Sequence, residues 1–379
     1  MSNTHLDSHH LKYTSRFSSC QNHIMSHNTQ NKKNSSIANI KVLGVGGGGS
    51  NAVKRMYKNR IEQVEYMIFN TDSQALDTSE MATAIKIGEK TARGLGVGGD
   101  PAKGRECAEE SRGIVRDLVD GSDLVFVAAG MGGGTGTGAA PIIAEIAKES
   151  GALTVGVVAK PFGFEGIKRQ KQALEGIATL RNQCDTLVVI PNDRLMLMAE
   201  DSLTMDSGFK LADDVLRQGV QSIAEVVIQA GEINLDLADV ISVMKNAGPA
   251  WMGIGTAKGD DRAEAAAKSA IQSPLLETSI EGSKGIIFNI VGGENLTMLE
   301  IEKASDIISR EAHPEANIIF GYGKDLSMTD ELRVTVIATG FPGSDSMYRD
   351  AEKNSSDNNS TSTENMDLDL PPFLRNSAQ

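Results

Sequence analysis

The sequence predicts an α/β protein: a parallel sheet covered by helices, then a long central helix, then a smaller α+β region. Three observations predict this architecture. Short apolar runs typical of strands alternate with helical segments between about residues 40 and 190, and glycine loops join strand to helix at three places. An amphipathic pattern with apolar residues three and four apart runs over residues 207–229, which indicates a single long helix.

Length and composition narrow the function classes. A chain of 379 residues is long enough for two domains, and 40% hydrophobic with 4% aromatic residues indicates an aliphatic core. A net charge of −13 without a basic patch argues against nucleic acid as a partner. No apolar run approaches the roughly 18 residues needed to span a bilayer, so we expect no direct membrane insertion. Cys20, Cys107 and Cys184 are far apart, which fits free thiols in a reducing compartment.

The most informative stretch is GMGGGTGTG at residues 130–138. It follows the apolar run 124–128, which has the character of a buried parallel strand, and precedes apolar residues at helical spacing. Pro141 is predicted to open that helix, because proline is favoured at the first helical position. Glycines let a backbone approach a ligand closely, the helix start directs free N–H groups at it, and Thr135 and Thr137 add hydroxyls. The natural ligand is a phosphate chain.

Two further glycine loops precede helices. Residues 44–51 follow a strand over 40–43, and Ser50 or Asn51 is predicted to cap the next helix. This loop matches the dinucleotide fingerprint G-x-G-x-x-G, which is weak evidence alone. Residues 94–101 precede a charged helix predicted over 103–119. Three such loops are more than a dinucleotide fold uses, and the sequence contains no G-x-x-x-x-G-K-[ST], so it is not a P-loop enzyme.

The other elements follow from the same patterns. Strands are predicted at 66–69, 85–87, 153–158 and 187–190, with a helix over 166–181. The C-terminal region, about 240–341, has a predicted helix at 298–312 and strands near 285–290, 317–320 and 333–338. The last of these strands alternates, which predicts a sheet with one covered face.

Both ends of the chain differ in composition from the middle. Residues 1–38 are rich in serine and histidine and poor in acids, which indicates a disordered extension or, alternatively, an organelle transit peptide. Residues 343–364 have the composition of a disordered linker. The final residues 365–379 include an apolar cluster within Asp369–Arg375, which resembles a docking peptide at the tip of a polar tether.

With its flanks, the glycine stretch GMGGGTGTGAAP at residues 130–141 resembles the signature of the tubulin family, in the form carried by the FtsZ family of prokaryotic and plastid cell-division GTPases. Other matches occur in the family's order: GVGGGGSNAV at 44–53, NTD at 70–72, RGLGVGGDP at 93–101, FEG at 164–166, PND at 191–193, ADDVLRQGV at 212–220, NLDLADV at 234–240 and VIATGF at 336–341. The resemblance covers about residues 40–341 and the C-terminal peptide, and its several independent motifs make it specific.

The resemblance implies a tubulin-like fold, with a GTP-binding domain over 39–206, a central helix over 207–230 and a C-terminal α+β domain over 231–342. It implies a GTPase that polymerises head to tail into protofilaments and builds a contractile ring at the division site. It places the protein in the cytoplasm at midcell, or in the plastid stroma if residues 1–38 are a transit peptide. Membrane-tethering division proteins would bind Asp369–Arg375.

The resemblance also implies nucleotide-binding residues, taken over by position. Nucleotide would be bound by Gly47, Gly48, Gly49, Ser50 and Asn51, and its phosphates would be cradled by Gly133, Gly134, Thr135 and Gly136. The γ-phosphate would be faced by Gly96, Gly98 and Gly99, and the ribose would be held by Glu165 and Arg169. Guanine would be contacted by Asn51, Asn192, Phe209 and Asp213. Phe209 would stack on the base, and an aspartate suits guanine because its two acceptors match the N1 and N2 donors. Ile167, Glu232 and Leu237 depart from the family's usual residues.

The acidic segment 234–239 allows two interpretations. Asp236 and Asp239 could merely cap the next helix and favour its dipole. Two carboxylates three apart also share a helical face, so they could orient a water. The resemblance implies the second role, with Asn234, Asp236 and Asp239 entering the nucleotide pocket of the next subunit. No general base is expected among the glycine loops, and Mg²⁺ would be held mainly by phosphate oxygens and water, without protein ligands.

Two other functions remain as alternatives. An NAD-dependent dehydrogenase would use the fingerprint at residues 44–49 with Asp72 on the ribose. A non-hydrolytic scaffold would bind nucleotide and only assemble. A shift in melting temperature with GTP or NAD separates the first alternative from a GTPase, and phosphate release on assembly separates the second.

Overall fold

The computed structural model describes residues 38–58, 60–61, 63–77, 83–197, 204–228, 237–276 and 279–341. The predicted N-terminal extension, the linker and the C-terminal peptide lie outside the described residues, apart from Ala38. Asn234 and Asp236 also lie outside them.

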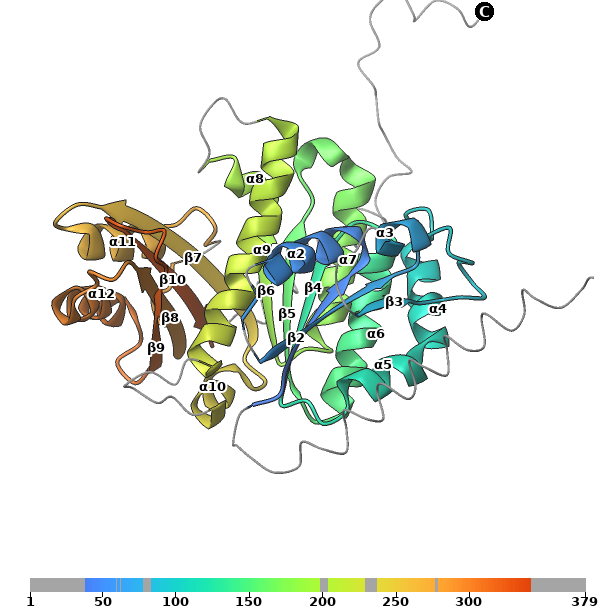
Figure 1. The fold of residues 1–379 in the computed structure, drawn as a ribbon, viewed down its shortest axis with the longest axis horizontal. Coiled ribbons are helices and arrows are strands. Elements are labelled where there is room, and N and C mark those ends of the chain that lie inside the picture. The colour runs from blue at the N-terminus through green and yellow to red at the C-terminus, as the bar shows by residue number, and fades with distance from the viewer. Residues whose placement is uncertain are drawn as a thin grey trace, which may run out of the picture. The chain divides into compact units, whose positions relative to one another are not determined.

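Within the described residues, the strands form one mixed sheet in the order β3-β2-β1-β4-β5-β6-β7-β10-β8-β9 (Figure 1). The strands are β1 Ile40–Val45, β2 Val64–Asn70, β3 Ala84–Lys86, β4 Leu124–Gly130, β5 Leu153–Lys160, β6 Thr186–Pro191, β7 Gly248–Lys258, β8 Gly285–Gly292, β9 Asn317–Lys324 and β10 Glu331–Thr339. Neighbours from β3 to β7 are parallel, as are β8 and β9, whereas β10 is antiparallel to β7 and β8.

The helices are α2 Gly46–Lys58, α3 Ser73–Asp77, α4 Pro101–Glu110, α5 Arg112–Val119, α6 Thr135–Glu149, α7 Ile167–Arg181, α8 Asn192–Leu195, α9 Met205–Ile228, α10 Leu237–Met244, α11 Arg262–Ile271 and α12 Met298–Glu311, with a short 3₁₀ helix η1 at Gly163–Glu165. Alternate residues of β4 enter two separate apolar clusters, Phe126 one and Val127 the other. The parallel part of the sheet is therefore covered on both faces, as predicted.

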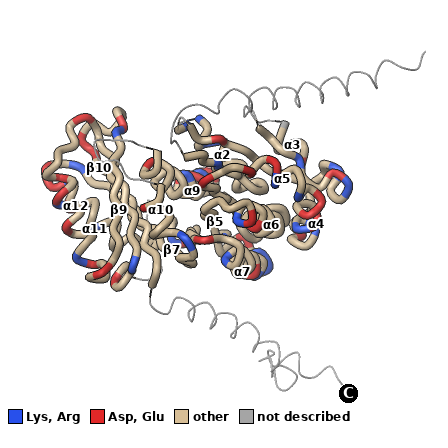
Figure 2. Tube along the Cα trace, turned by 90° about the horizontal axis from the view of Figure 1, so that it is seen from below, with Lys and Arg blue, Asp and Glu red and all other residues tan. Residues whose placement is uncertain are grey.

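Charged residues lie on the outer helices, such as α4 and α7, while the strands carry few (Figure 2).

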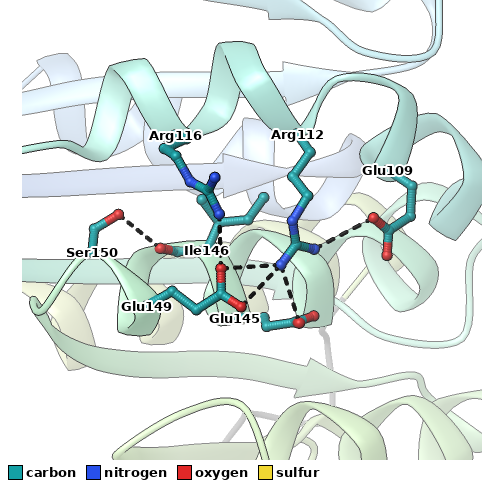
Figure 3. A network of polar contacts seen from close by, with 7 residues as sticks. All are labelled: Glu109, Arg112, Arg116, Glu145, Ile146, Glu149 and Ser150. Atoms are coloured by element: carbon teal, nitrogen blue, oxygen red, sulfur yellow. Dashed lines mark hydrogen bonds and ion pairs between the residues drawn. The ribbon is translucent and has the colours of Figure 1, made fainter.

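One network of ion pairs connects α4 and α5, which precede the signature loop, to α6, which follows it. Arg112 lies 3.1 Å from both Glu145 and Glu149, and Arg116 lies 2.9 Å from Glu149 (Figure 3). Glu109 of α4 completes the network at 3.4 Å from Arg112. Several partly exposed ion pairs that share partners fix the direction of α6 better than an isolated pair would.

Two predicted helix starts are wrong. Helix α6 begins at Thr135, so Pro141 lies inside it and not at its first position. Helix α2 begins at Gly46, so Ser50 and Asn51 lie within it and cap nothing. In both cases the glycine loop itself forms the first turn, since it turns directly from strand into helix.

The single helix predicted over residues 103–119 is also wrong. It consists of α4 and α5, separated at Ser111. Helix α4 opens with Pro101, and the Oδ1 atom of Asp100 accepts a hydrogen bond from the Ala102 N–H at 2.9 Å. A side-chain cap and a first-position proline therefore occur at α4, the helix that follows the third glycine loop.

The C-terminal half contains two elements that the sequence patterns missed, β7 and α11. The glycines of β7 are packing positions. A Cβ at Gly253 would lie 2.1 Å from the carbonyl oxygen of Ala270, and one at Gly255 would lie 2.1 Å from that of Ala266. The alanine-rich α11 thus rests directly on the backbone of β7. This helix also covers β10, whose residues from Val334 onward are buried on both faces, so the prediction of one covered face is wrong.

Two predictions from composition can be compared with the described residues. Cys107 and Cys184 are buried and form no disulfide, as expected. None of the described helices combines the length and apolar character that crossing a bilayer requires.

Candidate functional site

Three glycine loops meet at the carboxyl edge of the parallel strands. Gly46 follows β1 at a φ of +70°, and a Cβ there would lie 2.7 Å from the backbone nitrogen of Gly136, after β4. A Cβ at Gly134 would lie 2.5 Å from Val97 and 2.9 Å from the Asp100 nitrogen, both in the third loop. The loops therefore pack backbone against backbone, at distances that only glycine allows.

Threonine hydroxyls fasten the loops to one another. The Oγ1 atoms of Thr71 and Thr135 lie 2.7 Å apart, which joins the end of β2 to the start of α6. The Gly96 N–H donates to the Thr71 carbonyl at 3.1 Å, so the third loop is held by the same residue. Inside the signature loop, the Gly132 N–H donates to Thr137 Oγ1 at 2.8 Å.

Other glycines of the site have no packing reason to be glycine. A Cβ at Gly47, Gly98 or Gly99 would meet no protein atom within 4 Å, and all three residues are exposed. Gly98 and Gly99 have φ of +60° and +78°, a backbone conformation that favours glycine, so conformation explains why these two residues are glycines. Gly47 lacks a positive φ, so its open backbone is available for close approach by a ligand.

Two buried polar atoms at the same edge lack partners. Ser50 is 2% exposed and Asn192 is 6% exposed. Among the described residues, neither the Ser50 Oγ nor the Asn192 Oδ1 has a hydrogen-bond partner. Buried groups left in this way are rare in native proteins and often mark a place where another molecule binds. Asn51, next to Ser50, is exposed.

Glu165 and Arg169 form an ion pair beside the signature loop. Oε2 of Glu165 lies 2.7 Å from Nη1 of Arg169, and Oε1 accepts from the Phe162 N–H at 2.9 Å. A Cβ at Gly132 would lie 2.6 Å from the Arg169 carbonyl oxygen, and one at Gly133 would lie 4.0 Å from its Nη2. The start of α7 therefore lies against the signature loop, at Gly132 and at Gly133, which was predicted to bind phosphate.

Phe209 and Asp213 lie one turn apart on α9 and so share a face of that helix. Phe209 is 41% exposed, and its ring meets the rings of Phe162 and Phe164 edge to face, with centroids 5.4 and 6.3 Å apart. Burial raises the pKa of Asp213 to about 6, and the charge and hydrogen bond of Arg55 counteract part of that rise. An exposed aromatic face beside a carboxylate is suited to a planar base with ring N–H donors.

Arg55 was missed by the sequence reasoning. Its Nε lies 3.2 Å from Oδ2 of Asp213. The available signal was its spacing: Arg55 comes four residues after Asn51 on a predicted helix, so both residues point to the same side.

Two carboxylates, those of Asp72 and Asp100, lie among the glycine loops, where no general base was expected. A Cβ at Gly96 would lie 3.7 Å from Asp72, and Asp100 lies against Gly134. Both acids already accept hydrogen bonds from the backbone. Oδ1 of Asp72 accepts from the Gln74 N–H at 2.9 Å, and Asp100 caps the N-terminus of α4. Asp72 belongs to the third-loop contact here and not to the dinucleotide pattern that the dehydrogenase alternative requires.

Asp239 is not brought together with the other predicted site residues. It lies in the first turn of α10. The carbonyl of Met244, at the end of α10, accepts a hydrogen bond from Thr186 Oγ1 at 2.5 Å, and Thr186 is the first residue of β6. Helix α10 therefore lies at the amino edge of the parallel strands, at the end of the sheet opposite the glycine loops (Figure 1). The six residues of β6 alone separate the two edges by about 20 Å.

Glycine loops at the carboxyl edge of a parallel sheet, followed by a long helix that presents an aromatic ring and an acid, define a nucleotide-binding protein of the tubulin-like class. Comparison with known proteins agrees. The GTPase-domain model of the Tubulin/FtsZ family matches residues 39–200, and the C-terminal-domain model of the FtsZ family matches residues 248–342. The chain belongs to the FtsZ family. It is a polymerising GTPase of cell division, and this decides against the dehydrogenase alternative.

Solved structures show the same relationship. An empty FtsZ dimer from M. jannaschii is 40% identical, with a TM-score of 0.78 over 84% of this chain and 92% of that one. CetZ1 from Haloferax volcanii, solved as a GDP-bound monomer, is 19% identical, with a TM-score of 0.68 over 84% of this chain and 99% of that one. The CetZ1 match shows the shared fold alone.

Proposed function

We propose that the chain binds GTP or GDP at the glycine-loop edge and hydrolyses GTP only where two subunits meet head to tail. The observation that carries this proposal is the separation of Asp239 from the loops, by the length of the sheet, within one subunit. An acid placed there cannot act on the nucleotide of its own subunit. In a head-to-tail polymer, the amino edge of one sheet faces the carboxyl edge of the next.

The phosphates bind through backbone N–H groups. The first turns of α2 and α6 both start at the carboxyl edge, so their free N–H groups and positive dipole ends converge there. Gly47 to Asn51, Gly96 to Gly99 and Gly133 to Gly136 supply the contacts, and Glu165 with Arg169 holds the ribose. The unpartnered Ser50 hydroxyl and Asn192 amide oxygen gain partners from the nucleotide.

The base binds on α9. Guanine stacks on the exposed face of Phe209 and turns its N1 and N2 donors toward Asp213, one turn further along. A carboxylate accepts both donors, whereas adenine offers a different pattern of donors and acceptors. Asp213 therefore selects GTP over ATP.

Hydrolysis depends on acids from the neighbouring subunit. Asn234, Asp236 and Asp239 enter the γ-phosphate side of the pocket from α10 and the segment before it, where the two acids orient the attacking water. No group of three or more histidines, cysteines, aspartates or glutamates in the described part of the chain could hold a metal ion. Mg²⁺ would be held mainly by phosphate oxygens and water, where it would neutralise phosphate charge.

Self-association is part of the proposal. The M. jannaschii relative was solved as a dimer, and CetZ2 from Haloferax volcanii, 20% identical, was solved as a GTPγS-bound protofilament. By analogy, this chain forms head-to-tail protofilaments that build a ring at the division site in the cytoplasm, or in the plastid stroma. Asp369–Arg375 then binds a membrane-tethering division protein. A chain cut after Thr363 should polymerise and hydrolyse GTP normally yet fail to localise, and normal localisation would contradict the tail's role.

The direct experiment compares specific GTPase activity with protein concentration for the native chain, Asp239→Ala and Glu302→Ala. Glu302 is an exposed acid on α12 and serves as the matched control. The native chain and the control should show activity per molecule that rises above a threshold concentration. Asp239→Ala should bind GTP and sediment as polymer while hydrolysing GTP far more slowly. Activity per molecule that is independent of concentration in the native chain would refute the proposal.

A further inference from the structure

Arg55 and Asp213 form an ion pair that connects two parts of the nucleotide site. Arg55 lies on α2, one turn after Asn51, and Asp213 lies on α9, one turn after Phe209. The side chain of Asp213 is 14% exposed and that of Arg55 is 37% exposed. The pair therefore lies at the boundary between the protein interior and solvent, where α2 and α9 meet.

The contact occupies only one oxygen of the carboxylate. Nε of Arg55 donates to Oδ2 of Asp213 at 3.2 Å. Among the described residues, Oδ1 of Asp213 accepts no hydrogen bond. An ionised carboxylate has about four acceptor positions on its two oxygens, so the pair leaves Asp213 able to accept from a ligand.

The charge on Asp213 depends on this neighbour. Burial favours the neutral acid and raises the pKa of Asp213 to about 6. Of the charged groups around it, Arg55 from α2 lowers that pKa by its charge and its hydrogen bond, and Asp214 on the same helix raises it. Arg55 favours the ionised carboxyl, whereas burial and the charge of Asp214 both favour the neutral acid.

We propose that Arg55 is a positioning residue for guanine recognition: it holds Asp213 as a carboxylate and orients its free oxygen toward the N1 and N2 donors of the base. This inference rests on the proposed role of Asp213 in reading guanine. A protonated Asp213 would present an O–H donor where guanine also presents donors, so the match would be lost. Arg55 would not itself touch the base, and its effect would pass through the acid.

The test compares affinities for GTP and for inosine triphosphate, whose base lacks the exocyclic amine of guanine. Both are measured by calorimetric titration between pH 5.5 and 8.5, with the native chain, Arg55→Met, Arg55→Lys and Asp213→Asn. Lys58→Met serves as the matched control, because it removes an exposed cation from the same helix three residues further on. Circular dichroism of each nucleotide-free variant checks that it is folded.

For the native chain, the preference for GTP should be constant above pH 7 and fall as the pH drops through about 6, where Asp213 takes up a proton. In Arg55→Met, the midpoint pH of this decrease should be higher than in the native chain by about one pH unit or more. At pH 7, the preference for GTP should be lower than native by roughly tenfold. It should recover toward the native value at pH 8.5. Arg55→Lys keeps the charge, so its preference for GTP and its midpoint pH should lie between those of the native chain and Arg55→Met. Lys58→Met should match the native chain in both.

The outcomes separate the inference from the proposal beneath it. An Arg55→Met profile with the native midpoint, or a preference reduced equally at every pH, would overturn the positioning role. Asp213→Asn should lose the preference at all pH values. If that variant keeps the native preference, Asp213 does not read guanine, and the proposed base contact fails together with the inference.

Discussion

The hydroxyl oxygens of Thr71 and Thr135 lie 2.7 Å apart, and they join the end of β2 to the first residue of α6. Thr71 is fully buried, and its carbonyl also accepts the Gly96 N–H. One residue thus holds both the signature loop and the third glycine loop. The arrangement fixes the backbone groups that are proposed to bind phosphate before any nucleotide arrives, which should lower the conformational cost of binding.

The threonine pair should contribute a measurable coupling. Thr71→Val and Thr135→Val should each destabilise the protein, and the double variant should lose less than the sum by about 0.5–1.5 kcal/mol. Denaturant unfolding of the four nucleotide-free proteins gives this value. Strict additivity of the two single substitutions would show that the hydroxyls do not stabilise each other.

Gly47 should separate ligand binding from folding. A Cβ at Gly47 would meet no protein atom within 4 Å, so Gly47→Ala should leave the nucleotide-free protein as stable as the native chain or more so. GTP affinity should nevertheless fall, because the methyl group would enter the path of a closely approaching phosphate. Gly113→Ala on α5 is the control: its Cβ also meets nothing, and it should add about 0.5–1 kcal/mol of stability without changing affinity. Unchanged affinity in Gly47→Ala would argue against phosphate at the first loop.

Asp213 should destabilise the nucleotide-free protein at neutral pH. Its pKa in the folded state, about 6, lies above its ordinary value of 3.8, so the folded state holds the proton more tightly between those values. The ionised acid therefore lowers stability as the pH rises through this window. Asp213→Asn should melt at a higher temperature than the native chain at pH 7.5, and the difference should vanish near pH 4. A lower melting temperature for the variant at pH 7.5 would contradict this.

Arg262 should be a major support of the C-terminal part. It is 5% exposed, and its Nε donates to Oε1 of Glu300 at 2.6 Å. Arg262→Met leaves a mostly buried carboxylate without its cation and should cost about 3–5 kcal/mol of unfolding free energy. Lys268→Met, which breaks an exposed pair with Glu264 on the same helix α11, should cost about 1 kcal/mol or less.

The effect of Arg262 should depend on pH. The hydrogen bond from Arg262 holds the pKa of Glu300 below its ordinary value of 4.5. That contribution is complete above the ordinary value and is lost as the pH falls through the folded-state pKa. The stability difference between the native chain and Arg262→Met should therefore narrow in acid. A difference that stays constant from pH 7 to pH 3 would mean that the ion pair contributes little.

The sequence patterns predicted the strands of the parallel sheet because a buried strand between two helical layers has a dense apolar run and sharp ends. They failed where glycine has a role other than turning the chain. Gly253 and Gly255 make β7 resemble a loop, although they let α11 approach the strand. Pro141 suggested a helix start, because proline at that position is common, but the preceding glycines were already helical.

The site residues were predictable where they depend on local helical spacing, and not where they depend on tertiary packing. Phe209 and Asp213 follow from helical spacing together with a family motif, and the structure places them on one face of α9. Arg55 could not be paired with Asp213, because the crossing of α2 and α9 depends on tertiary packing between residues far apart in sequence. The position of Asp239 could not be derived either, since it depends on where α10 joins the amino edge of β6.

The measurement that tests the shared active site most directly mixes two inactive variants. Gly134→Val should lose nucleotide binding, because its side chain would collide with Val97 and Asp100, yet it keeps the acids of the α10 region. Asp239→Ala should bind GTP but present no complete acid pair. Mixed at equal concentration, the first protein can supply its acids to GTP bound by the second, so GTPase activity should return to a substantial fraction of the native value. No activity in a mixture that demonstrably co-sediments as a joint polymer would contradict hydrolysis by acids from the neighbouring subunit.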